Sequence, residues 1–132
     1  MRRQRFASMA CPIARSLDII GEWWTLLIVR DLARGINRFD TLQEDLGIAR
    51  NMLTVRLQTL LDHGVIERHC YQQRPERFEY HLTEKGAELT AVLRALKQWG
   101  ERWTEAPSSS PVISLADGQK DEDAVFEMHA QE

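Results

Sequence analysis

The sequence predicts a mainly α-helical domain with a small β-hairpin wing, an α+β arrangement known as a winged helix-turn-helix. Three observations over residues 38–86 support this fold class: two short amphipathic helices flank a glycine turn, two alternating strands follow, and a proline lies between those strands. The order places one helix where it can enter a DNA groove, with a charged hairpin beside it.

The charge distribution divides the 132 residues into one domain and a tail. Residues 1–104 hold 16 Lys/Arg and 13 Asp/Glu, a net charge of +3, whereas residues 105–132 hold one Lys and seven Asp/Glu, a net charge of −6. We therefore predict a frayed arm over 1–10, a folded domain over 11–104, and an acidic, disordered tail over 105–132. Two short apolar groups in the tail, 112–115 and 124–128, are candidates for local docking.

The composition excludes several protein classes. At 43% hydrophobic and 28% charged residues it is that of an ordinary soluble protein, and no apolar run approaches the roughly 18 residues of a membrane span. No apolar signal-peptide core follows the N-terminal arginines, so we expect a cytoplasmic location. Two cysteines and four histidines, none at metal-ligand spacing, predict neither a disulfide framework nor a metal site, and no cofactor is expected.

Two helices are predicted before the winged region. The first begins at Pro12, with Cys11 as its N-cap, and ends at Gly21. The second spans roughly 22–34 and is apolar on almost every side. A helix of that kind must be covered on more than one side, and in so small a domain we expect a second subunit to supply part of the cover.

The helix-turn-helix itself follows. Apolar residues spaced three and four apart predict a helix over 39–46, Gly47 makes the turn, and Ile48 fills it. A further helix runs roughly over 50–63 and ends at Gly64. Its inward stripe consists of Leu53, Leu57, Leu60 and Leu61.

Alternating residues predict a strand over 65–71, a tip over 72–76 in which Pro75 stops further pairing, and a return strand over 78–82. A last helix begins at Thr83 and carries a heptad seam over about two heptads. The seam consists of Leu89, Val92, Leu96, Trp99 and Trp103.

This seam either packs on its own domain or joins a second copy, since two heptads are few for a coiled coil. We expect a homodimer, because the last helix and the second helix both need cover. The tryptophans can alternatively be core residues or line a ligand pocket between subunits. The expected interface consists of Ile13, Leu17, Trp23, Trp24, Leu89, Val92, Leu96, Trp99 and Trp103.

Over residues 11–103 the chain resembles the HxlR family of bacterial winged-helix regulators, which is related to the MarR group. The resemblance implies a homodimeric, DNA-binding repressor or activator without catalysis. It also implies a small-molecule or oxidant effector, sensed in some members by the N-terminal cysteine. Two departures are Ala49, where the family has serine, and a single wing proline, Pro75. The matching segments are Cys11-Pro12, 24–28, 38–42, Met52-Leu53-Thr54, Arg56-Leu57, 64–68 and 78–86.

One face of the helix over 50–63 is predicted to read DNA bases. Arginine can fork onto guanine, asparagine and glutamine onto adenine, and threonine or valine can touch a thymine methyl group. A solvated polar face is the alternative. The outward residues are Arg50, Asn51, Thr54, Val55 and Gln58, with Arg56 on the flank as a phosphate contact.

Three further arginines are candidate DNA contacts. Arg74 and Arg77 flank the wing tip, where they can enter the minor groove or bind phosphate, or else pair with the neighbouring glutamate. Arg38 precedes the helix over 39–46 and is expected either to bind phosphate or to pair with Asp40 or Asp45. Ala49 cannot supply the side-chain cap usual at a helix start.

Cys11 is a candidate redox sensor. A helix N-terminus favours the thiolate, the form that reacts with oxidants and electrophiles, although a small buried residue at the helix start is the alternative. Nothing near Cys11 in the sequence supplies a catalytic base, so we do not expect an enzyme. A winged-helix module that binds proteins instead of DNA is the alternative function, since an acidic tail can mask a basic surface.

Overall fold

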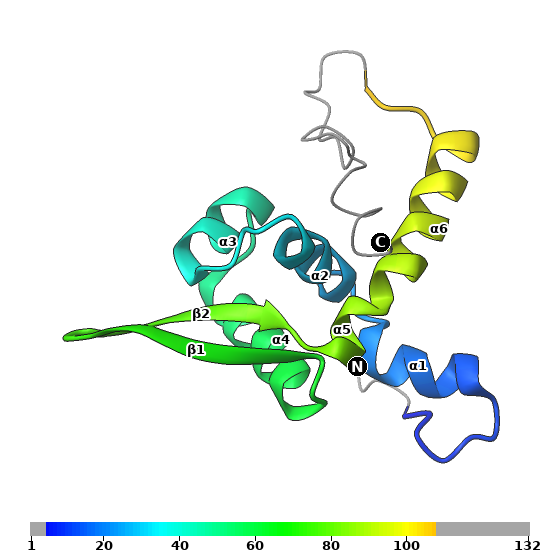
Figure 1. Ribbon diagram of the computed structural model, residues 1–132. Helices are drawn as coiled ribbons and strands as arrows, with labels where there is room; N and C mark the ends of the chain where they lie inside the picture. The colour runs from blue at the N-terminus through cyan, green and yellow to red at the C-terminus, as the bar shows by residue number, and fades with distance from the viewer. Residues whose placement is uncertain (1–4, 108–132) are drawn as a thin grey trace.

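The computed structural model describes residues 5–107, and within them it has the predicted mainly helical architecture with a two-stranded antiparallel hairpin (Figure 1). The hairpin projects from the helices on the side away from α6. No helix in this part of the chain is long and apolar enough to cross a membrane. The elements are α1 (Pro12–Ile20), α2 (Thr25–Ala33), α3 (Phe39–Leu46), α4 (Arg50–Asp62), β1 (Ile66–Gln73), β2 (Glu76–Leu82), α5 (Glu84–Ala87) and α6 (Leu89–Trp103).

The helix-turn-helix is formed by α3 and α4. Gly47 ends α3 in the left-handed conformation, with φ of 67°, and its amide donates to the Gln43 carbonyl at 2.9 Å. Ile48 lies buried in the turn, as predicted. Leu42 of α3 and Leu53 of α4 are both fully buried, so the two helices share one core.

The wing differs from its prediction in the length of its strands. Pairing continues from Ile66↔Leu82 to Gln73↔Glu76, so the tip is only Arg74–Pro75 instead of 72–76. Proline interrupts no ladder hydrogen bond there, because it lies in the turn itself. On its other edge β2 joins the segment before α3: the Tyr80 amide donates to the Asn37 carbonyl at 2.8 Å.

The predicted last helix is divided in two. Thr83 caps α5, its hydroxyl accepting from the Gly86 amide at 3.2 Å and donating to the Gly64 carbonyl at 2.6 Å. Gly86 is buried so closely against the Val65 carbonyl oxygen that a Cβ would clash there. This close contact holds α5 against the base of the wing, and α6 begins as a separate helix at Leu89.

Helix α2 is central to the core. Ile28 and Val29 are fully buried, and α2 packs against α3, β2 and α6 of its own chain. The core side of α2 is therefore covered by its own chain, whereas Trp23 and Leu27 stay exposed, so partial cover by a second subunit remains a prediction. The helix also begins at Thr25 instead of residue 22, because Glu22 and both tryptophans form a preceding turn.

A separate apolar face remains exposed. Trp23 is 88% exposed and Trp99 is 62% exposed, whereas Trp24 and Leu89 are half-buried against the core. Between α1 and α6 an apolar groove of about 450 Å³ is lined by Leu17 and other residues of the predicted interface. The face is formed by Ile13, Leu17, Trp23, Val92, Leu96, Trp99 and Trp103.

The ends of the domain are the predicted arm over 1–10 and the predicted tail over 105–132. Part of the predicted frayed arm contacts α1: the Phe6 amide donates to Asp18 at 3.0 Å, and Arg15 donates to the Met9 and Ala10 carbonyls. The predicted acidic tail falls almost entirely on residues 108–132, which lie outside the described residues.

Candidate nucleic-acid interface

Helix α4 presents one apolar and one polar face. Leu53, Leu57 and Leu60 are at most 2% exposed and hold the helix against the core. The opposite face is exposed, as helical periodicity predicts. Its exposed residues are Arg50, Asn51, Thr54, Val55 and Gln58.

The start of α4 leaves its backbone donors available. Ala49 is the N-cap and makes no side-chain capping hydrogen bond, as its methyl group predicts. The first amides of α4 therefore have no capping side chain, and free amides at a helix start favour the binding of an anion such as phosphate. A cation–π contact positions Arg50: its guanidinium group lies 4.7 Å from the centre of the Phe39 ring on α3.

Two residues of the polar face already make bonds within α4. The Thr54 hydroxyl donates to the Arg50 carbonyl at 3.1 Å, and the Gln58 amide donates to the Asp62 carboxylate at 2.8 Å. Gln58 must exchange its bond with Asp62 before that amide can donate to a base. Arg50 and Asn51, by contrast, lie at the exposed N-terminal end that usually meets base edges.

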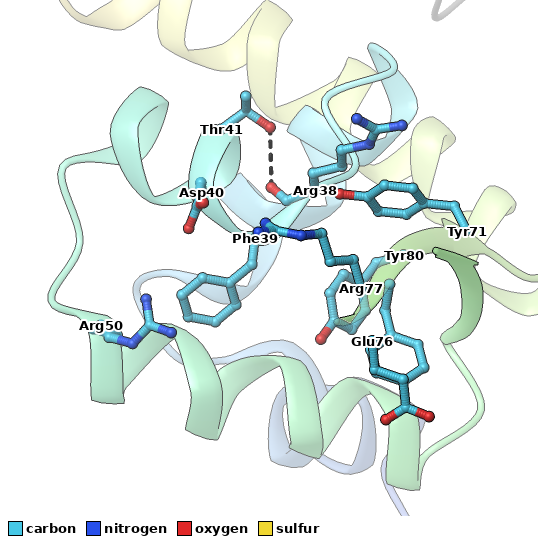
Figure 2. Close-up of a pocket in the computed structure, with 10 residues that line it drawn as sticks. Arg38, Phe39, Asp40, Thr41, Arg50, Tyr71, Glu76, Arg77 and Tyr80 are labelled. Atoms are coloured by element: carbon cyan, nitrogen blue, oxygen red, sulfur yellow. Dashed lines mark hydrogen bonds between the residues drawn. The ribbon is translucent and has the colours of Figure 1, made fainter. Parts of the chain in front are cut away.

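A cleft of about 520 Å³ separates the wing from α3 and the start of α4 (Figure 2). Arg77 extends from β2 across this cleft toward Phe39 and Asp40. Arg74 is exposed at the wing tip. Within residues 5–107 neither arginine forms an ion pair with Glu76, so the alternative prediction of a closed charged turn is not what the structure has.

Arg38 joins the wing to the helix-turn-helix. Its guanidinium group donates to the Glu79 carboxylate at 3.0 and 3.3 Å and lies 3.8 Å from the Tyr71 ring centre. This arginine beside Glu79 is the main cause that lowers the pKa of that carboxyl, followed by His81. The partner is therefore neither Asp40 nor Asp45, and half of the Arg38 side chain is still exposed for a phosphate.

Arg56 does not lie free on the flank of α4. Its side chain is 16% exposed, and one guanidinium nitrogen is 3.9 Å from the Glu22 carboxylate. The Arg56 Nε atom is buried without a hydrogen-bond partner. Arg56 thus links α4 to the turn before α2 and is too little exposed to serve as one of the proposed phosphate contacts.

An ionic cluster between α2 and α3, with buried Asp31 at its centre, was not predicted from the sequence. Asp31 is fully buried, 3.0 Å from Arg30 and 3.7 Å from Arg34, and both arginines also reach Asp45 of α3. Burial, followed by the hydrogen bond with Asp45, raises the pKa of Asp31 to about 7. The available signal was Arg30-Asp31 followed by Arg34, charges at helical spacing inside an apolar helix.

The two cysteines occupy different settings. Cys11 is exposed at the start of α1 and makes no capping hydrogen bond, so the alternative of a buried residue does not hold. Cys70 is also an exposed free thiol, but its Sγ donates to the Gln72 carbonyl at 3.0 Å. Within residues 5–107 no three His, Cys, Asp or Glu side chains are arranged to hold a metal ion.

The chain is similar in sequence to known helix-turn-helix regulators. A relative from Mycobacterium tuberculosis, the uncharacterized HTH-type transcriptional regulator Rv3095, is 42% identical over 100 residues. That match covers 76% of this chain and 63% of the relative, so the chain spans under two thirds of that protein's length.

Solved structures are similar as well. The transcription factor PA1607 superposes with a TM-score of 0.76 at 39% identity, over 90% of this chain and 84% of that one. The redox regulator HypR in its oxidized form gives a TM-score of 0.66 at 33% identity, over 73% of this chain and all of that one. A family model described as HxlR-like helix-turn-helix matches residues 19–108. The chain therefore belongs to the HxlR-like helix-turn-helix family.

Proposed function

We propose that the chain is a cytoplasmic, homodimeric transcriptional regulator that binds a near-palindromic DNA operator. The observation that carries the proposal is the exposed polar face of α4 together with the wing residues Arg74 and Arg77, which form no ion pair within residues 5–107. In this arrangement α4 enters the major groove, Arg50 and Asn51 meet base edges, and the wing contacts the adjacent backbone or minor groove.

The exposed apolar face supports the homodimer. Its tryptophans and the groove between α1 and α6 present large apolar side chains to water, which a soluble protein covers by association. In a symmetric dimer the same face of both copies is buried. Two α4 helices can then lie in successive major grooves, about 34–36 Å apart.

Arg50→Ala tests the reading face, with Arg102→Ala on α6 as a control that removes an exposed arginine elsewhere. Binding to the chain's own upstream DNA and to an unrelated duplex is measured by gel shift at several salt concentrations. We expect Arg50→Ala to weaken specific binding by about 1–3 kcal/mol and non-specific binding much less. Equal loss on both duplexes would make Arg50 a phosphate contact.

The same assay separates the alternative function. A winged-helix module for protein binding predicts no DNA binding by the full chain or by a chain that ends after residue 107. Under that result the α4 face is a solvated or protein-binding surface. Salt-dependent binding by either form supports the regulator instead.

Response to oxidants or electrophiles through Cys11 is proposed as the control of this activity. The exposed thiol at the start of α1 supports it, and HypR, a redox regulator, is a structural relative. Operator affinity is measured before and after diamide or a quinone for the wild type, Cys11→Ser and Cys70→Ser. We expect only Cys11→Ser to lose the response, and an unresponsive wild type excludes the sensor.

A further inference from the structure

The cleft between the wing and α3 combines arginine side chains with aromatic rings. Arg50 and Arg77 form no ion pair within residues 5–107, whereas Arg38 is held by Glu79. An acidic segment that carries an apolar side chain matches this chemistry, because guanidinium groups bind carboxylates and rings cover apolar groups. The rings are those of Phe39, Tyr71, Phe78 and Tyr80.

Two carboxylates also line the cleft, those of Asp40 and Glu76. Neither is in an ion pair within the described part of the chain. The Glu76 carboxylate is directed away from the Arg50 and Arg77 guanidinium groups (Figure 2). Arg77 reaches toward Asp40 without forming an ion pair with it, so within residues 5–107 neither Arg50 nor Arg77 has an ion-pair partner that an anionic ligand would have to displace.

The chain contains a segment of matching composition, residues 121–128. Four carboxylates, at positions 121, 122, 123 and 127, lie around Val125, Phe126 and Met128 in the sequence. The segment follows residue 108, where the match to the family model ends. It therefore lies beyond the part of the chain that the family model matches.

The connection is long enough to reach the cleft. Helix α6 ends at Trp103, and residues 104–120 can span up to roughly 55 Å at about 3.3 Å per residue. A domain of this size has a radius of gyration of about 13 Å, and the extended connection is several times that length.

We propose that residues 121–128 dock into this cleft and compete with DNA for Arg50 and Arg77. Phe126 packs among the rings and the carboxylates pair with the two guanidinium groups. A tethered segment acts at an effective concentration of about millimolar, so even weak docking holds the cleft occupied in the absence of DNA. The competition rests on the proposed function, whereas the docking itself needs no DNA.

Docking is tested in the full chain without DNA, from the amide resonances of the cleft residues Tyr71 and Arg77. The test variant is Asp121→Asn with Asp123→Asn, and the charge-matched control is Asp117→Asn with Glu132→Gln. Phe126→Ala removes the apolar anchor at constant charge. We expect the test variant and Phe126→Ala to shift the cleft resonances and the control to leave them in place. Identical cleft resonances in the wild type and the test variant overturn the proposal.

Competition is then measured as affinity for the upstream duplex at about 50 mM salt. The test variant is expected to bind two- to fivefold more tightly than the charge-matched control, as an effective concentration of a few millimolar against a dissociation constant of about 1 mM predicts. Equal affinities overturn the competition. If no variant binds DNA, the proposed function fails while the resonance shifts still report docking.

Discussion

Replacing Asp31 with asparagine removes a carboxylate that the fold holds in its interior. The wild-type Asp31 side chain is fully buried, and its Oδ2 atom has no hydrogen-bond partner within the described residues. Burial raises the pKa of Asp31 from 3.8 to about 7. Asparagine has the same shape and no charge to desolvate, so the two proteins must differ in how stability depends on pH.

The sign follows from proton counting. Between pH 4 and 7 the native state keeps the Asp31 proton while the unfolded state has lost it, so the free energy of unfolding falls as pH rises. Each pH unit costs about 1.4 kcal/mol in this window. Relative to Asp31→Asn, the wild type should lose about 2 kcal/mol between pH 5 and 7, and little more above pH 8.

The measurement is urea unfolding of both proteins at pH 5, 6, 7 and 8, with protein concentration held constant because an associating protein changes stability with concentration. Asp40→Asn, which replaces an exposed carboxylate on α3, is the control and should follow the wild type at every pH. A difference between wild type and Asp31→Asn that does not change from pH 5 to 8 would refute the reasoning.

Three other predictions concern packing, association and the wing. Gly86→Ala should destabilise the fold by about 1–3 kcal/mol in urea unfolding, because the new Cβ clashes with the Val65 carbonyl. Gly100→Ala should stabilise it by about 0.5–1 kcal/mol, because its Cβ meets only Thr104 Oγ1 at 3.9 Å. Equal effects of the two substitutions would contradict the packing at Gly86. Leu96→Glu, at a half-exposed position, should give a monomer by light scattering with unchanged circular dichroism, and a persistent dimer would exclude this face. Arg38→Met should speed hydrogen exchange of the Tyr80 amide, which bonds Asn37, while Arg74→Met at the tip should not; unchanged exchange in both would show that Arg38 does not secure the wing.

Local sequence patterns predicted most of the helices and strands of the fold. The leucine spacing of α4 and the glycine at residue 47 predicted the helix-turn-helix, because helical periodicity and a left-handed turn depend only on nearby residues. The outward face of α4 followed from the same periodicity. Where the prediction was wrong, as for the ion-pair partner of Arg38, the answer depended on which distant strand of the same chain comes to lie beside that residue.

The sequence by itself determined the order of the elements, the face of α4 that meets solvent, and the resemblance to the HxlR family. Only the tertiary structure decided which charges are engaged and which are free. Arg38 bonds Glu79, 41 residues away, Arg56 approaches Glu22, and Arg30 and Arg34 of α2 approach Asp45 of α3. Such pairs join separate elements, and no spacing along the chain encodes them. Electrostatic partners are set by packing, since a charge takes whichever opposite charge the folded backbone brings within a few ångströms.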